Sequence, residues 1–287
     1  MRIVVLGSTG MAGHMISHYL EEAGHEVFCI SRSEKNGPNS QAIDVTNFAA
    51  LSKYLDEVSP QAVVNCVGLL QKACEQRPDL AVLINTYLPH YLEQHFAQRE
   101  TKVIHLSTDC VFSGEQGGYT EDMLPDGRTM YDRSKALGEI INGKDLTFRM
   151  SIIGPDPDPK GTGLLNWFME QTGEIQGYSK CIWNGVTTLE LAKAINQALR
   201  ESISGLYHLV LSKPINKYDL LCLFHEFFPR EGLDINKIDG LVQDKSLINT
   251  RIDFGFEVSP YRQQISELKE WVTAHKVFYP HYHMFYN

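Results

Sequence analysis

Short apolar runs alternate with longer segments of mixed polarity along the first two thirds of the chain. The apolar, β-branched runs predict strands at residues 2–6, 26–30, 61–67, 102–107, 146–153 and 205–210. The segments between them predict helices at residues 13–23, 47–58, 79–99, 131–141 and 190–200. Strands separated by helices indicate βαβ units, and right-handed crossovers arrange such units as an α/β fold with a doubly wound parallel sheet.

The pattern changes after residue 153. Residues 155–163 hold three prolines and two glycines, a composition typical of a loop or a lobe boundary. We therefore predict a larger part at residues 1–153 with a return segment at about 184–212, and a smaller α/β lobe from about 154–183 and 213–287. The aromatic run at residues 277–287 is expected to pack against this lobe, because apolar rings bury readily.

Composition narrows the class of protein. Hydrophobic residues make up 43% of the 287 and charged residues 21%, as in a soluble globular enzyme. A formal net charge of -9 argues against a nucleic-acid partner, and no apolar run is long enough to span a membrane. The six cysteines are scattered without zinc spacing, so we expect free thiols in a reducing cytoplasm and no metal.

A glycine-rich turn directly follows the first predicted strand and opens the first predicted helix. In that context small residues let the backbone approach a pyrophosphate, and the helix N-terminus supplies N–H donors. The spacing is GxxGxxG, and a merely tight strand–helix turn is the competing interpretation. We expect a Rossmann-type domain that binds a dinucleotide along Gly7, Ser8, Thr9, Gly10, Met11, Ala12 and Gly13.

The end of the second predicted strand bears on the choice of dinucleotide. An acidic residue there would hydrogen-bond the ribose of NAD, but Ser31 and Arg32 stand at this position. Because Arg32 could pair with a 2′-phosphate, NADPH is favoured and NADH is the alternative. Asp44 and Val45 follow a third predicted strand tip and could hold the adenine, although a helix N-cap in this stretch competes.

Tyr131 and Lys135 form the most informative pair of polar residues. Four positions apart on a predicted helix, their side chains lie on one face. An ammonium beside a phenol is expected to lower the pKa of the tyrosine, which could then exchange a proton with a carbonyl or alcohol. Together with the glycine turn, the pair indicates hydride chemistry on a C=O or CH–OH group.

These motifs, with the run STDCVFSG at residues 107–114, resemble the extended short-chain dehydrogenase/reductases. Within them the run is similar to the dTDP-4-dehydrorhamnose reductase (RmlD-type) branch, over about residues 1–210. The resemblance implies reduction of the keto group of a nucleotide-linked 4-keto-6-deoxyhexose for polysaccharide synthesis. Such proteins often dimerise, so the sequence leaves a homodimer open.

The resemblance also assigns roles by position. It implies that Thr108 hydrogen-bonds the substrate carbonyl, that Tyr131 donates the proton, and that Lys135 lowers the pKa of Tyr131 and holds the nicotinamide ribose. Arg149 matches an arginine at a strand end, for which a structural ion pair is the alternative. The resemblance also implies that Cys66, Val67, Gly68 and Asn85 contact the cofactor. The residues that it implies contact the substrate are Thr108, Asp109, Val111 and Tyr131.

The sequence departs from the branch around the sugar. At residues 65–76 this chain reads NCVGLLQKACEQ, where the branch typically reads NAAAYTxVDxAE. The run RMSIIGP at residues 149–155 lacks the tryptophan that the branch has there, and Val186 stands where the branch has a proline. A related nucleotide sugar therefore stays open as the substrate. The alternative functions are a nucleotide-sugar epimerase or dehydratase of the same superfamily, and a non-catalytic dinucleotide-binding subunit such as the regulatory subunit of methionine adenosyltransferase.

Overall fold

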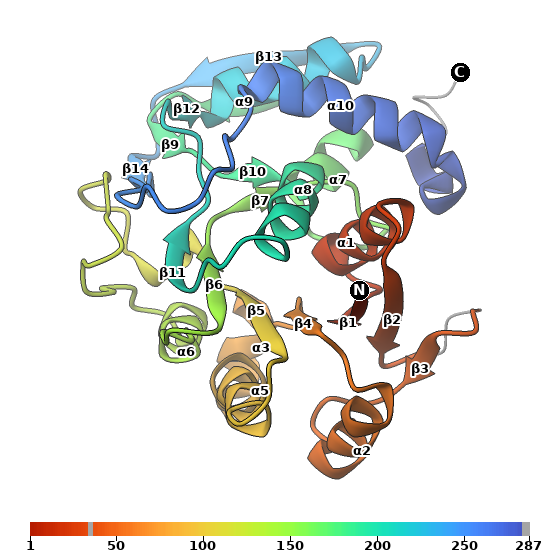
Figure 1. The fold of residues 1–287 in the computed structure, drawn as a ribbon. Helices are drawn as coiled ribbons and strands as arrows, with labels where there is room; N and C mark the ends of the chain where they lie inside the picture. The colour runs from red at the N-terminus through yellow and green to blue at the C-terminus, as the bar shows by residue number, and fades with distance from the viewer. Residues whose placement is uncertain (34–36, 283–287) are drawn as a thin grey trace.

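A seven-stranded sheet, parallel throughout, forms the centre of the computed structural model, which describes residues 1–33 and 37–282 (Figure 1). Its order, β11-β6-β5-β4-β1-β2-β3, places β1 between the two halves of a doubly wound arrangement. The strands are β1 (Arg2–Leu6), β2 (Glu26–Ser31), β3 (Ser40–Ala42), β4 (Ala62–Asn65), β5 (Lys102–Leu106), β6 (Leu146–Arg149) and β11 (Gly205–His208). The predicted fold class is confirmed.

Alternation along the strands builds a core on each face of the sheet. Ile3 and Val5 of β1 pack on the side of α1 (Met11–Glu22) and α8 (Thr188–Ala198). Val4 and Leu6 pack on the opposite side, with α2 (Phe48–Val58) and α5 (Leu88–His95). Because successive strand side chains point to opposite faces, the continuous apolar runs read from the sequence are buried on both sides.

The segment predicted as one helix at residues 79–99 is interrupted. It consists of α4 (Pro78–Ala81), a π-helical turn at Val82–Tyr87, and α5, which ends at His95. The π turn carries Asn85, whose side chain is fully buried against the neighbouring loop. The helix predicted at 131–141 is α6 (Met130–Leu137), whose start is fixed by a capping box between Thr129 and Asp132.

Residues from the second half of the chain form the part of the molecule above α1 and α8 in Figure 1. The strand predicted at 146–153 breaks into β6 and β7, and three small sheets follow. Their strands are β7 (Ile152–Ile153) with β10 (Val186–Thr187), β8 (Gly173–Tyr178) with β13 (Leu233–Ile238), and β9 (Cys181–Trp183) with β12 (Ile215–Asn216) and β14 (Gln243–Asp244). The helices are α7 (Leu164–Glu170), α9 (Lys217–Phe227) and α10 (Tyr261–Ala274). The division of the chain into two parts stays a prediction.

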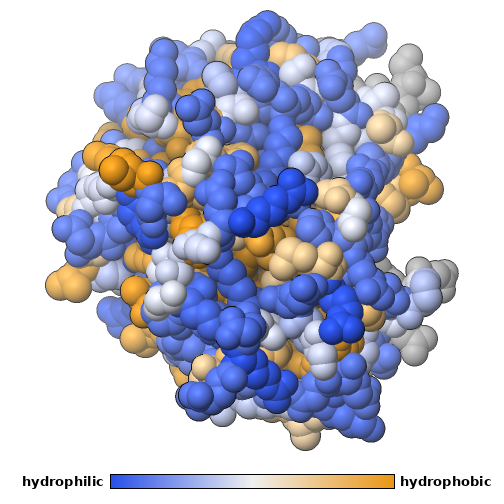
Figure 2. All heavy atoms as spheres, in the orientation of Figure 1, coloured by the Kyte–Doolittle hydropathy of each residue, from blue (hydrophilic) through white to orange (hydrophobic). Residues whose placement is uncertain are grey.

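The C-terminal aromatics contact both parts of the molecule. The Tyr279 hydroxyl lies 2.7 Å from Nε2 of His14 in α1, and Tyr282 donates to Asn166 of α7. Both rings are buried: Tyr282 packs on the predicted smaller lobe and Tyr279 contacts α1 as well, while residues 283–287 of the run lie outside the described residues. Hydrophilic residues cover most of the face in Figure 2, and apolar residues show between them in several places. Among the described residues, no helix is long and apolar enough to cross a membrane.

Candidate active site

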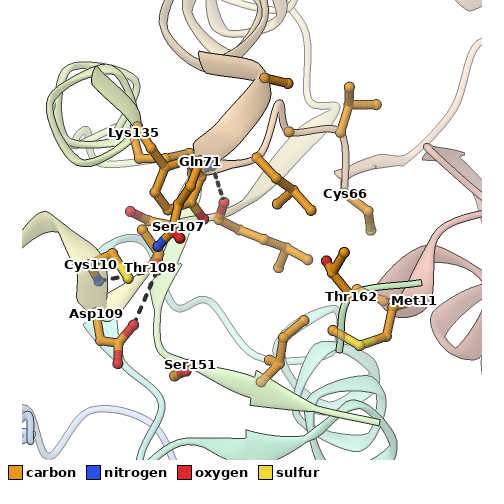
Figure 3. Close-up of a pocket in the computed structure, with 18 of the residues that line it drawn as sticks. Met11, Cys66, Gln71, Ser107, Thr108, Asp109, Cys110, Lys135, Ser151 and Thr162 are labelled. Carbon is orange, nitrogen blue, oxygen red and sulfur yellow. Dashed lines mark hydrogen bonds between the residues drawn. The ribbon is translucent and has the colours of Figure 1, made fainter. Parts of the chain in front are cut away.

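A cavity of about 830 Å³ opens at the carboxyl ends of β1, β4, β5 and β6. This is the edge of a doubly wound sheet at which ligands bind. In Figure 3, Thr108, Asp109 and Cys110 line one side, and Met11 and Thr162 lie on the opposite side. Predicted residues that line it are Met11, Ala12, Cys66, Val67, Gly68, Thr108, Asp109, Tyr131 and Lys135.

The glycine turn is shaped by close backbone contacts. Gly7 adopts a φ of +77°, a conformation that favours glycine. A Cβ added to Gly13 would lie 2.1 Å from the Gly7 carbonyl oxygen, so the turn and the helix can approach only with glycine there. At Gly10 the nearest atom would be that same oxygen at 3.6 Å, an ordinary contact. Ser8 is buried, and its hydroxyl donates to the Ile30 carbonyl at 3.3 Å.

This turn fits the pyrophosphate of a dinucleotide. Gly10 is the N-cap of α1 and has no side chain with which to cap the first-turn N–H groups. Those groups and the positive end of the helix dipole therefore face the space beside Met11 and Ala12, which line the cavity.

The residues predicted to hold the adenine end lie beside one another after β2 and β3. Arg32 is exposed. The pKa of the Asp44 carboxyl is lowered mainly by hydrogen bonds from Thr46, and the charge of Arg32 contributes in the same direction. Ser31 is buried and donates to the Ser33 carbonyl. The Val45 side chain packs in the core, so only its main chain is available to a ligand. The competing N-cap role belongs to Asn47, which accepts from the Ala50 N–H at 3.1 Å.

Thr108 and Asp109 stand where β5 ends and a single 3₁₀ turn, Asp109–Val111, begins. The Thr108 hydroxyl accepts from the Cys110 N–H at 3.1 Å and lies 3.2 Å from the Asp109 carboxylate. Burial raises the pKa of Asp109, while Lys245 and Lys217 act in the opposite direction. Thr108 and Tyr131 both line the cavity, and Thr108 acts to lower the pKa of the Tyr131 phenol.

The predicted electrostatic effect on Tyr131 is wrong. Its pKa is raised, first by burial and then by the neighbouring Cys110 and Asp109, with Thr108 opposing them. Lys135 is on the same helix, but its Nζ donates to the Leu106 carbonyl at 2.6 Å and lies 3.3 Å from His105 Nε2. Burial lowers the pKa of Lys135 to about 8. Tyr131 is therefore held as a phenol.

Asn85 and Val111 do not have the ligand-binding roles predicted for them. The Asn85 carboxamide bonds the Leu69 main chain and the Ser134 hydroxyl, so it fixes the loop after β4. Val111 is fully buried, because the 3₁₀ turn directs it into a small cluster with Phe112, Tyr119, Val210 and Leu247. The prediction that the Val111 side chain contacts the substrate is therefore wrong.

Arg149 forms a structural ion pair, which was the alternative interpretation of this residue. Its guanidinium bonds both carboxylate oxygens of Glu139, at 2.8 and 2.6 Å, and lies 3.0 Å from His208 Nε2. Ser107 donates to the same carboxylate at 2.6 Å. The pair is almost completely buried and supports the strand ends under the cavity.

Sequence reasoning missed several groups on the cavity wall. Gln71, Lys72 and Gln76 come from α3 (Gln71–Gln76), and Ser151 and Thr162 come from the segment between β6 and α7. The first three stand in the stretch where the sequence departs from the branch pattern, so that departure was the available signal. Ser151 stands in the RMSIIGP run, which also departs from the branch pattern, whereas no local pattern marks Thr162.

Comparison with known proteins identifies the family. The sequence model described as RmlD substrate binding domain matches residues 1–241. The probable low-salt glycan biosynthesis reductase Agl14 of Haloferax volcanii is 33% identical over 240 residues, covering 76% of this chain and 77% of that protein. Methionine adenosyltransferase 2 subunit beta of Xenopus laevis is 21% identical over 243 residues, covering 79% and 72%.

A solved structure gives the same result at the level of the fold. The dTDP-4-dehydrorhamnose reductase of Bacillus anthracis, in complex with NADP, matches with a TM-score of 0.79 at 18% identity, covering 93% of this chain and 98% of that one. The predicted resemblance is confirmed by the family match and by the relative at 33% identity. By its sequence match and by the relative at 33% identity, the chain belongs to the RmlD substrate binding domain family, the RmlD-type branch of the extended short-chain dehydrogenase/reductases.

Proposed function

We propose that this chain is an NADPH-dependent reductase of a nucleotide-linked 4-keto-6-deoxyhexose. The observation that carries the proposal is that Thr108 and Tyr131 line one cavity, which also opens beside the glycine turn. The reductase name of the Haloferax volcanii relative and the family match support the same reaction class.

The residues around the cavity suit a carbonyl substrate. The Thr108 and Tyr131 side chains line the same cavity, and both hydroxyls would hydrogen-bond a carbonyl oxygen bound between them. A bound NADPH would supply a hydride with its electron pair to the carbonyl carbon. The Tyr131 phenol would give its proton to the oxygen, and the raised pKa of Tyr131 ensures that this proton is present.

Two lysines favour an anionic substrate such as a nucleotide diphosphate. Lys217 opens α9, its Nζ lies 5.0 Å above the Trp183 ring, and Lys245 lies against Gly114. The positive charges of both lysines act on the buried Asp109 carboxyl at the cavity wall. Lys72 also lines the cavity, whereas Arg251 and Arg262 are held by Asp253 and Glu226. Lys217 and Lys245 are therefore the cations that we assign to the phosphates.

The test is the loss of NADPH absorbance with a panel of 4-keto-6-deoxy nucleotide sugars, with NADH in parallel. Turnover of one sugar should fall by about 10²-fold or more in Tyr131→Phe. Tyr87→Phe, at an exposed tyrosine, is the matched control and should keep the rate. Dinucleotide binding without turnover of any sugar would contradict the reductase and favour the non-catalytic subunit that the Xenopus laevis relative represents.

A further inference from the structure

The C-terminal segment, residues 271–282, lies along α1, the helix that the glycine turn opens. In Figure 1 the chain at the end of α10 comes down beside α1. Ring contacts join the two at successive turns of α1. In order along the segment they are Trp271 with Tyr19, Phe278 with His18, and Tyr279 with His14. The contacts therefore approach the N-terminal end of α1, where the glycine turn lies.

His14 joins this segment to the glycine turn through hydrogen bonds at both ring nitrogens. The side chain is 1% exposed, with Nδ1 at 3.0 Å from the Gly10 carbonyl oxygen and Nε2 at 2.7 Å from the Tyr279 hydroxyl. A carbonyl oxygen can only accept, so Nδ1 carries the proton. In the neutral ring Nε2 then holds the lone pair and accepts from the Tyr279 hydroxyl. The donors therefore run in one direction, from Tyr279 through His14 to Gly10.

The Gly10 carbonyl belongs to the peptide unit that carries the Met11 N–H. Gly10 is the N-cap of α1, and its carbonyl also accepts from the main-chain N–H of His14 at 2.9 Å. Because a trans peptide unit is planar, a second donor on the carbonyl fixes the direction of the Met11 N–H, which points the opposite way. Hydrogen bonds in a chain also polarise one another, which makes this N–H a stronger donor. Met11 lines the cavity.

Tyr279 is held in place from its other side. It is completely buried, and its ring stacks on Tyr282 with 5.7 Å between the centroids. The Tyr282 hydroxyl donates to Asn166, which in turn donates to the main chain of the loop that brings Thr162 to the cavity. These contacts restrict the Tyr279 ring and keep its hydroxyl directed at His14.

We propose that His14 and Tyr279 are positioning residues for the dinucleotide. They hold the peptide unit between Gly10 and Met11 so that the Met11 N–H faces the pyrophosphate that the glycine turn fits. This rests on the proposed function, because that function brings a dinucleotide to the turn. It adds that the far C-terminal part of the chain contributes to cofactor binding by acting through Gly10.

Two substitutions of His14 separate its two hydrogen bonds. The Asn amide nitrogen lies near the place of Nδ1, so His14→Asn keeps a donor for Gly10. The Gln amide reaches the place of Nε2, so His14→Gln keeps a partner for Tyr279 and loses the donor to Gly10. In a fluorescence titration, the Kd for NADPH should rise about 5-fold or more in His14→Gln and stay within about 2-fold in His14→Asn. The matched control is His18→Gln, which alters the contact with Phe278 one turn further along α1 and should keep the Kd.

The role of Tyr279 is tested in both backgrounds. Tyr279→Phe keeps the ring but removes the donor that holds the imidazole, so it should raise the Kd for NADPH by about 3-fold in the otherwise unsubstituted protein. In His14→Asn the same change should have no effect, because the Asn side chain does not use that donor. Tyr261→Phe is the control, since it removes a buried hydroxyl of α10 that has no hydrogen-bond partner among the described residues.

Nuclear magnetic resonance on the protein alone gives an independent readout. Long-range ¹H–¹⁵N spectra, with His14 assigned from its loss in His14→Asn, report which ring nitrogen is protonated. We expect a proton on Nδ1. An Nδ1 without a proton in the unsubstituted protein would overturn the proposal without any variant having to fold.

The outcomes separate this proposal from the function on which it rests. Equal Kd values in the unsubstituted protein and His14→Gln, or an equal rise in His18→Gln, would overturn the proposal alone. An effect of Tyr279→Phe that persists in His14→Asn would do the same. A protein that binds no dinucleotide would overturn the proposed function as well, whereas NADPH binding without turnover of any sugar would count against the reductase alone.

Discussion

Replacing Lys135 by methionine should make the protein more stable at neutral pH. The ammonium is 4% exposed, and its pKa falls from 10.5 to about 8 on burial. That difference of about 2.5 pH units corresponds to roughly 3 kcal/mol of destabilisation at neutral pH, at about 1.4 kcal/mol per unit. Methionine removes this cost but leaves the Leu106 carbonyl without its donor, a loss of about 1 kcal/mol. The net expectation is a gain of about 2 kcal/mol near pH 7.

The pH dependence of stability gives the sharper test. Between about pH 8 and 10.5 the unfolded state binds more protons at this lysine than the folded state, so the free energy of unfolding rises with pH. The advantage of Lys135→Met should therefore shrink by roughly 3 kcal/mol across this window. Urea unfolding at a series of pH values measures the free energy of unfolding of the unsubstituted protein and of Lys135→Met.

An exposed lysine provides the matched control. The Lys53 side chain is 79% exposed, so Lys53→Met should give a stability difference that does not vary across the same window. If the curves of the unsubstituted protein and Lys135→Met ran parallel between about pH 8 and 10.5, the reasoning from burial would be refuted.

Two further substitutions test the turn and the buried ion pair. Gly13→Ala would place a Cβ 2.1 Å from the Gly7 carbonyl oxygen, so the affinity for NADPH should fall by about 10-fold or more. Fluorescence titration measures this affinity, and an unchanged value would contradict the close contact. Glu139→Gln leaves the Arg149 guanidinium buried without its counter-charge and should lower the free energy of urea unfolding by about 3 kcal/mol. Glu226→Gln, in the exposed pair with Arg262, should cost under about 1 kcal/mol, and equal losses in the two variants would argue against burial as the cause.

Much of the fold could be predicted from the sequence because the relevant signals are local. The apolar runs that became β1 and β4 are continuous, as is typical of strands buried on both faces. The glycine turn between β1 and α1 depends on the backbone freedom and small size of residues within one short segment. Thr108 and Tyr131 were predicted from their motifs, and the structure brings them together in one cavity.

Only the tertiary structure decided the electrostatics of the site. The spacing of Tyr131 and Lys135 along one helix predicted a lowered tyrosine pKa, yet the lysine bonds His105 and Leu106, which belong to β5. Likewise Val111 and Asn85 sit in motifs whose positions suggest ligand contacts, but packing turned one into a core cluster and the other onto the loop after β4. A pKa and a side chain's direction depend on burial and on through-space partners, which segments distant in the sequence supply and local spacing does not specify.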